Sequence, residues 1–158
     1  MPGRVAENVI LGIGNSLRSD EGVGVHAVRA LEARGGLPGA DLVDGGTNAY
    51  EALASYDGIG RLIVVDAVDA KSEPGALFRF EERDLAPMQE PVSLHQMGLL
   101  DALAPLRAAG VEIGEVVVIG VQPAVTGWGL DLSEAVADRL DTIVELAARE
   151  VRACAVGG

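Results

Sequence analysis

The sequence predicts an α/β protein, a three-layer sandwich in which helices cover both faces of a mostly parallel five-stranded sheet. Short apolar runs rich in β-branched residues alternate with longer segments of helical period, which is the pattern of a parallel sheet. The chain has 158 residues, a length that suits one compact core without disulfides or structural zinc. We therefore expect a single domain over residues 1–158.

The strands are predicted from continuous or alternating apolar runs. They are expected at 8–13, 40–43, 61–65, 76–80 and 115–121. Segment 76–80 alternates apolar and polar residues, unlike the others, and too few residues precede it for a helical crossover. We expect it to be the one antiparallel strand, at an edge of the sheet.

Helical periodicity predicts the elements between these strands. Helices are expected at 21–33, 47–56, 93–109 and 132–153. Ser19 or Asp20 suits the N-cap of the first helix, Thr47 that of the second and Ser93 that of the third. Pro105 should bend or break the third helix. Turns or loops are expected at 44–47, 81–91 and 122–130.

Two glycines lie in the first turns of the expected 21–33 helix. Gly22 and Gly24 each cost about 1 kcal/mol of helix stability relative to alanine. We therefore expect another part of the chain to approach the helix backbone closely at these positions.

Charge and composition exclude several classes of function. The 24 acidic and 12 basic side chains give a net charge of −12, which repels phosphate, so we expect no nucleic-acid partner. Cys154 is the single cysteine, which rules out an internal disulfide and favours a reducing cytoplasm. Every apolar run is much shorter than the roughly 20 residues that span a membrane, and no secretory signal is recognisable. We expect a cytoplasmic monomer with no membrane partner.

The end of the first expected strand could suggest a dinucleotide site. Gly12 and Gly14 match the first two glycines of that motif, but Leu17 occupies the third position. Asp20 and Glu21 would also repel a pyrophosphate at the following helix. A dinucleotide enzyme therefore stays a minor alternative. The chain has neither the Gly-x-Ser-x-Gly elbow of serine hydrolases nor the His-Glu-x-x-His helix of zinc proteases.

Acidic residues follow the carboxyl ends of three expected strands, where open α/β sheets place their functional groups. Asp20 and Glu21 lie beyond the first strand, Asp44 beyond the second and Asp66 at the end of the third. They share one edge if the first strand lies between the other two. His95, near the start of the third helix, would add an imidazole. Histidine and carboxylates together suit a borderline divalent metal and leave coordination positions open.

Each of these residues also has a purely structural interpretation. Asp20 alone would more often be an N-cap than a ligand, and Glu21 could compensate the helix dipole. Asp66 could cap a turn, and His95 could face solvent. His26, five residues after Glu21, lies about 140° around the helix axis from it, so we expect no role for it in the cluster.

Six sequence blocks together resemble the nickel-iron hydrogenase maturation proteases, in the same order and at matching separations. The blocks are GIGNSL at 12–17, DEGVG at 20–24, DGGT at 44–47, VVDAV at 64–68, SLHQ at 93–96 and IGVQP at 119–123. The resemblance spans about residues 8–150. It implies an endopeptidase that removes a short C-terminal extension from the large-subunit precursor of a nickel-iron hydrogenase after nickel has been inserted.

The resemblance also implies roles for individual residues. The family's metal-contacting glutamate, aspartate and histidine match Glu21, Asp66 and His95, the three residues that the strand-end argument also selects. The site would sense nickel that the precursor supplies, so the protease itself need not hold a permanent metal. The DGGT block, with Gly45, Gly46 and Thr47, is expected to bind substrate.

The mechanism implied is hydrolysis by water, since no serine or cysteine nucleophile is available. Asp20 or Asp66 would act as general base, and the chemistry would be aspartic-type or assisted by the metal. A nickel-binding assembly chaperone that docks on the hydrogenase subunit without cutting it would use the same residues. The sequence departs from the family's usual pattern at 48–50 and in the loop that carries Trp128, which could both shape the choice of precursor.

Overall fold

A computed structural model describes residues 3–85 and 94–152, except the side chains of 94–98 and 100. Its strands form one sheet in the order β2-β1-β3-β5-β4. They are β1 (Arg4–Ile13), β2 (Ala40–Gly46), β3 (Tyr56–Ala67), β4 (Leu77–Glu81) and β5 (Glu112–Val121). Neighbouring strands are parallel except for β4, which pairs antiparallel with β5 at the sheet edge. This confirms the five strands and the antiparallel edge.

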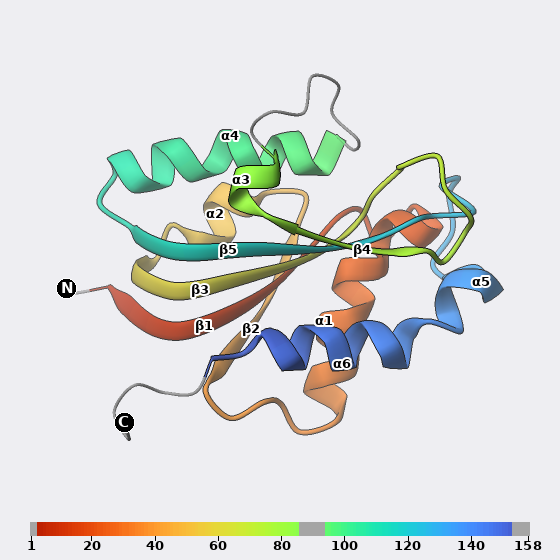
Figure 1. Cartoon of the computed structure of the whole chain (residues 1–158), viewed down its shortest axis with the longest axis horizontal. Helices are drawn as coiled ribbons and strands as arrows, with labels where there is room; N and C mark the ends of the chain where they lie inside the picture. Colours follow the sequence, from red (N-terminus) through yellow and green to blue (C-terminus); the bar gives the residue numbers. More distant parts are fainter. Residues whose placement is uncertain (1–2, 86–93, 153–158) are drawn as a thin grey trace.

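Helices lie on both faces of the sheet (Figure 1). They are η1 (Ser19–Gly22), α1 (Val23–Ala33), α2 (Ala49–Leu53), α3 (Glu82–Leu85), α4 (Leu94–Ala108), α5 (Glu134–Ala137) and α6 (Leu140–Glu150). One face is covered by α2 and α4 and the other by α1 and α6, which confirms the three-layer sandwich. Within 3–85 and 94–152, no helix is long and apolar enough to span a membrane.

Alternate residues of the central strands supply two separate cores. In β1, Val9 and Leu11 pack in the core under α2 and α4, while Ile10 between them packs under α1 and α6. This alternation follows from the two-residue period of a strand. Each such side chain stabilises the fold by about 1.5–3 kcal/mol when fully buried. Both faces of the sheet are therefore apolar, which explains the continuous hydrophobic runs in the sequence.

Several expected boundaries differ from those observed. Thr47 does not cap α2: the Oδ1 of Asn48 accepts the N–H of Glu51, so Asn48 is the N-cap. The helix ends at Leu53 because Tyr56 already belongs to β3, where it is buried and donates to Asp41. Two expected loops are shorter than predicted. The strand β2 continues through Gly46, and residues Glu82–Leu85 form the turn of helix α3. The Ser93 cap lies outside the described residues.

The prediction of one C-terminal helix over 132–153 is wrong, because α5 and α6 are separate. Between them, the N–H of Arg139 donates to the carbonyl of Val136, three residues back, which tightens the chain out of α-helical bonding. At the other end, α6 stops at Glu150. The N–H of Arg152 donates to Asn8 in β1, whose amide in turn donates to the carbonyl of Arg152, and this pair holds the chain extended.

The glycines of the first βα connection allow the close approach expected there. A Cβ on Gly24 would lie 2.0 Å from the carbonyl oxygen of Val65, and one on Gly12 would lie 2.2 Å from that of Gly24. Backbone atoms cannot yield at such distances, so only glycine fits. The start of α1 therefore rests directly on the carboxyl ends of β1 and β3.

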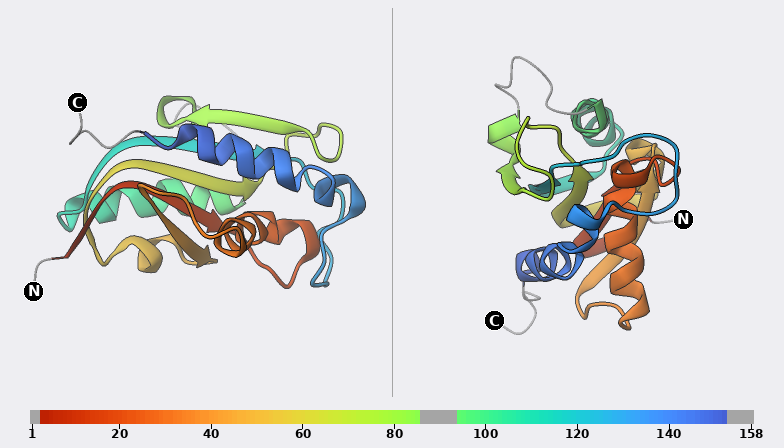
Figure 2. Two further views of the ribbon diagram at one scale, coloured as in Figure 1. Left: turned by 90° about the horizontal axis from the view of Figure 1, so that it is seen from below. Right: turned by 90° about the vertical axis from the view of Figure 1, so that its right-hand side faces the viewer.

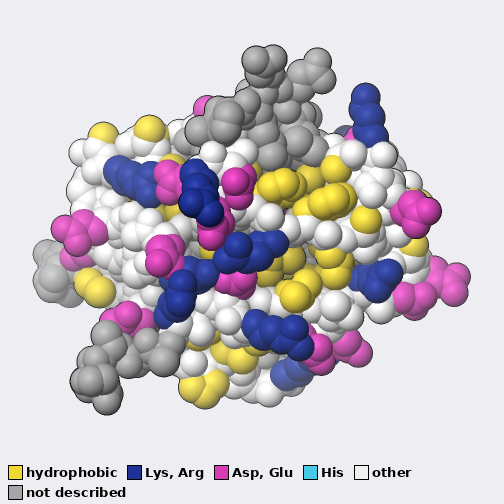
Figure 3. Space-filling view, in the orientation of Figure 1, with side chains coloured by type: hydrophobic (Ala, Val, Ile, Leu, Met, Phe, Trp, Pro, Cys, Tyr) yellow, Lys and Arg dark blue, Asp and Glu magenta, His cyan; other side chains and the backbone are white. Residues whose placement is uncertain are grey.

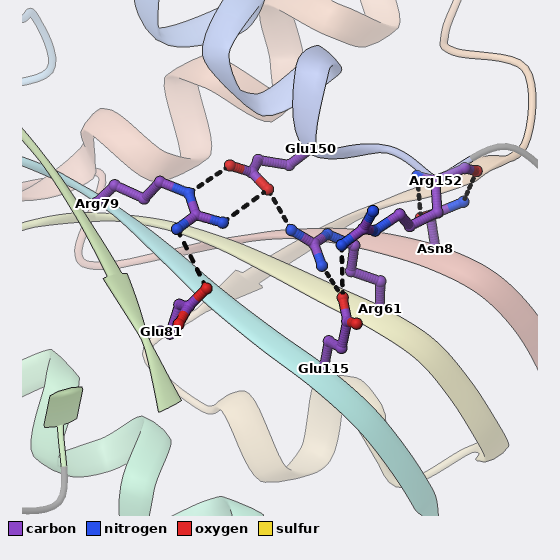
Figure 4. Close-up of polar contacts among 7 residues, drawn as sticks. All are labelled: Asn8, Arg61, Arg79, Glu81, Glu115, Glu150 and Arg152. Atoms are coloured by element: carbon purple, nitrogen blue, oxygen red, sulfur yellow. Dashed lines mark hydrogen bonds and ion pairs between the residues drawn. The ribbon is translucent and has the colours of Figure 1, made fainter. Parts of the chain in front are cut away.

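A charged network lies between the sheet and α6 (Figure 4). Arg61 of β3 is almost fully buried and pairs with Glu115 of β5 and Glu150 of α6. The Nε of Arg79 in β4 also donates to Glu150, at 2.6 Å. This bond, together with the pairing to Arg61, outweighs desolvation and lowers the pKa of Glu150. Figure 3 shows the surrounding surface, where basic and acidic side chains alternate. The network fixes the end of α6 to three strands.

Candidate active site

The side chain of Asp66 and the backbone of Glu21 both lie near Gly14, at the carboxyl edge of the sheet. Asp66 is 0% exposed near the end of β3, beside the end of β1. A Cβ on Gly14 would lie 1.9 Å from the carbonyl oxygen of Glu21 and 3.6 Å from the Oδ1 of Asp66. Gly14 also has a φ of +127°, which glycine adopts without strain. The structure thus places Asp66 and Glu21 at the same edge, as their positions after β1 and β3 predict.

The expected substrate-binding residues border the same point. The N–H of Gly14 donates to the carbonyl of Gly46 at 2.7 Å, and the carbonyl of Gly45 accepts the N–H of Asn48. Thr47 is exposed at the turn that follows. These contacts close the end of β2 onto the end of β1. Gly46 therefore lies against Gly14, with Gly45 and Thr47 on either side of it in the sequence, and the binding of substrate by these three residues stays a prediction.

Asp20 is held in a way that its sequence position does not suggest. Its carboxylate is 0% exposed and accepts four hydrogen bonds at 2.7–2.9 Å from the far end of the chain. The donors are the N–H groups of Ala124, Val125 and Ser133 and the hydroxyl of Ser133. Burial raises the pKa of Asp20, but these bonds outweigh burial and lower it overall.

The expected N-cap at Ser19 or Asp20 is therefore wrong. Neither η1 nor α1 has a side-chain cap, and Arg18 and Gly22 occupy the capping positions. Ser19 instead donates its hydroxyl to the carbonyl of Gly127. Both polar side chains face the loop after β5, so tertiary contacts replace the local capping that the sequence favours.

Glu21 is half-buried and makes one ion pair with a neighbour. Its Oε2 lies 3.5 Å from the Nε of Arg18, which also donates to the carbonyl of Thr126. Arg18 thus connects Glu21 to the loop after β5. Sequence reasoning missed this arginine, although its spacing of three residues from Glu21 is one that a helical turn brings together.

The other residues singled out in the sequence are His95, Asp44, His26 and Cys154. His95 lies in the first turn of α4, and its side chain is outside the described residues. Among the side chains that are described, no group of three histidine, cysteine or acidic residues is placed to hold a metal. Asp44 is exposed and pairs with Arg29 at 3.7 Å. His26 is half-buried along α1. Cys154 lies outside the described residues.

The arrangement at this edge can support hydrolysis. A buried aspartate, Asp66, and a half-buried glutamate, Glu21, both lie near Gly14, where the ends of three strands come together. Oxygen ligands of this kind can hold a metal ion or accept a proton from water. The fold is an open α/β sheet with its acids at the switch point of strand order, which is where such sheets bind ligands.

Comparisons with known proteins identify the class. A family model described as hydrogenase maturation protease matches residues 25–150. The hydrogenase expression/formation protein HupD of Rhodobacter capsulatus is 37% identical over 158 aligned residues, which cover 97% of this chain and 75% of that protein. The hydrogenase 2 maturation protease of Escherichia coli K12 is 37% identical over 118 residues, or 73% of this chain and 72% of that one.

Solved structures share the whole fold. The hydrogenase maturating endopeptidase HybD from Escherichia coli superposes with a TM-score of 0.76 at 30% identity, covering 89% of this chain and 88% of that one. The [NiFe] hydrogenase maturation protease HybD from Thermococcus kodakarensis gives a TM-score of 0.80 at 27% identity, covering 92% and 99%. The chain is therefore a hydrolase of the endopeptidase class, and it belongs to the hydrogenase maturation protease family.

Proposed function

We propose that this protein removes the C-terminal extension from the large-subunit precursor of a nickel-iron hydrogenase once nickel has been inserted. The observation that supports it most directly is the junction at Gly14, which brings Glu21 and Asp66 to one edge of the sheet. Membership of the maturation protease family supplies the substrate class. The reaction takes place in the cytoplasm, and a monomer is sufficient for it.

Glu21, Asp66 and His95 engage nickel that the precursor carries. Two carboxylates and an imidazole suit a borderline divalent ion and leave positions for ligands from the precursor. The chain offers a single cysteine, so any thiolate ligands come from the substrate. Nickel is in this sense part of the substrate, and its presence docks the scissile bond at the junction. Positioning of this kind contributes much of the rate of an enzyme, and here it also makes cleavage depend on nickel insertion.

Water is the nucleophile, and the geometry favours Asp66 over Asp20 as its general base. All four donors around Asp20 belong to the protein, and they occupy both of its oxygens. Asp66 lies instead at the Gly14 junction with Glu21. Asp20 then acts as a positioning residue for the loop after β5. A metal near the scissile bond can polarise the carbonyl or lower the pKa of the attacking water.

The test compares nickel-loaded and nickel-free precursor with purified protein, and mass spectrometry follows the size of the precursor. We expect shortening of the nickel-loaded form alone. Glu21→Gln, Asp66→Asn and His95→Ala should each reduce processing by at least about 100-fold, the scale of a lost catalytic contribution. His26→Ala, a histidine outside the cluster, serves as the control and should retain activity.

Several results would count against this proposal. Equal cleavage of both precursor forms would refute nickel sensing. Normal processing by His95→Ala would remove the histidine from the site. Nickel-dependent binding of the precursor with no change in its mass would instead identify a non-proteolytic assembly chaperone.

A further inference from the structure

Large apolar side chains are exposed next to the candidate active site. Among the described residues, the exposed large hydrophobics are Val5, Leu17, Tyr50, Val125, Trp128 and Leu130. Four of these six come from two short segments, the one before η1 and the loop after β5. Trp128 is 77% exposed and Leu130 is 68% exposed. Tryptophan is enriched among the residues that dominate protein–protein binding, so an exposed one beside an active site indicates an interaction surface.

The backbone under this surface is fixed by hydrogen bonds. The N–H of Gly129 donates to the carbonyl of Leu17, and the N–H of Ser19 donates to the carbonyl of Gly129, both at 2.9 Å. These bonds pair Arg18 with Gly129 as a parallel bridge. Figure 2 (right) shows the loop after β5 passing across the segment that precedes α1. Together with the four bonds to Asp20, this pairing holds the loop against the segment before α1.

Arg18 joins this surface to the active site. Its guanidinium lies 5.2 Å from the centre of the Trp128 ring, within the range of a cation–π contact. The same group lies 3.5 Å from Glu21 and donates to the carbonyl of Thr126. Arg18 therefore supports the indole on one side and contacts a candidate metal ligand on the other. A ligand that covers Trp128 would therefore lie next to Arg18, which contacts Glu21 at the carboxyl edge of the sheet.

We propose that the surface formed by Leu17, Arg18, Trp128 and Leu130, here called the Trp128 surface, binds an apolar segment of the hydrogenase precursor. This rests on the proposed function, which supplies the occupant, and on the continuity through Arg18 with Glu21. Trp128 is the anchor, because it offers the largest apolar area. The backbone beneath it is already held by hydrogen bonds, so little backbone conformational entropy remains to be lost on binding. The Trp128 surface thus selects the hydrogenase precursor, while Glu21 and Asp66 sense the nickel that it carries.

Trp128 is the only tryptophan of the chain, which provides a probe at the surface itself. Protein labelled with 5-fluorotryptophan gives one ¹⁹F resonance, and unlabelled precursor adds none. We expect that resonance to shift or broaden when nickel-loaded precursor is added. Cleavage of the precursor with an unchanged resonance would overturn the docking role alone. A wild-type protein that neither binds nor cleaves the precursor would overturn the proposed function as well.

Steady-state kinetics give an independent test. Trp128→Ala should raise KM about tenfold or more with little change in kcat, as expected for a binding anchor outside the chemistry. Trp128→Phe keeps an aromatic ring over Arg18 and should recover most of the affinity. Val5→Ala, which truncates a residue that is 75% exposed, is the matched control and should keep the wild-type KM.

Two further outcomes would overturn the docking role. A wild-type KM for Trp128→Ala is one. The other is a ¹⁹F resonance that moves with protein concentration before any precursor is added, because a second copy of the chain would then occupy the surface.

Discussion

Replacing Asp20 by asparagine tests the anchor of the loop after β5. The amide turns one acceptor oxygen into a donor. The better orientation of the asparagine places its NH₂ group where Oδ1 of Asp20 was, because Oδ1 accepts only the N–H of Ser133. The amide oxygen then takes the place of Oδ2, which accepts the other three bonds. A hydrogen bond to a charged group contributes about 1.5–3 kcal/mol, and one to a neutral group about 0.5–1.5 kcal/mol. One bond is lost and three are weakened, so we expect the loop to lose at least about 3 kcal/mol of stability.

The loop should therefore detach before the domain unfolds. Fluorescence anisotropy of Trp128 follows the loop, and far-UV circular dichroism follows the whole domain. In urea the two transitions should coincide for the wild type, whereas in Asp20→Asn the anisotropy should fall first. Asp131→Asn changes an exposed carboxylate of the same loop and should behave as the wild type. Coincident transitions at the wild-type midpoint in Asp20→Asn would refute the anchoring role.

Two further predictions concern the fold. Gly24→Ala should lower the free energy of unfolding by about 3 kcal/mol in urea titrations, because its Cβ would lie 2.0 Å from a backbone oxygen; Gly58→Ala, with contacts of 3.8 Å or more, should cost far less. Glu150→Gln should lower the free energy of unfolding by about 3 kcal/mol, because the buried guanidinium of Arg61 loses one of its carboxylate partners. Glu145→Gln, at an exposed position of the same helix, should lower it little. The pKa of Glu150 is lowered from 4.5, so the stabilisation of the fold by its charge is complete above that pH and is lost as the pH falls through the folded pKa. Glu150→Gln should therefore remove this component of acid unfolding. An acid transition that is the same in the variant and the wild type would contradict this prediction.

The fold could be predicted from the sequence because its strands are nearly continuous apolar runs. Such runs are expected only where both faces of a sheet are covered, and this condition fixes the three layers. Strand lengths could not be predicted, because Arg4–Ala6 and Tyr56–Gly60 include polar and small residues that pair only through tertiary contact. The division of the C-terminal helix was missed for a similar reason: its apolar spacing continues through the break, while the hydrogen bonding of Arg139 changes there.

The candidate site was predictable to the extent that it depends on strand ends. Asp66 and Glu21 could be placed at one edge because parallel strands end at the same side of a sheet. The environment of Asp20 could not, since an aspartate before a helix is most often a cap and its actual donors lie more than 100 residues away. Arg18 and Trp128 are likewise far apart in sequence, and they are brought together by the hydrogen bonds between the segment before η1 and the loop after β5.

The distance between Asp20 and its donors also determines when the site can form during synthesis. A ribosome releases the chain from its N-terminus, so Asp20 and Glu21 emerge long before residues 124–133 have been made. Until then the carboxylate of Asp20 has none of its four donors, and Trp128 does not exist. An incomplete chain consequently holds Asp20 and Glu21 but lacks the hydrogen bonds that anchor the loop after β5 at this edge. The edge around Asp20 can therefore be completed only after strand β5 and the loop that follows it have been made and have joined the domain.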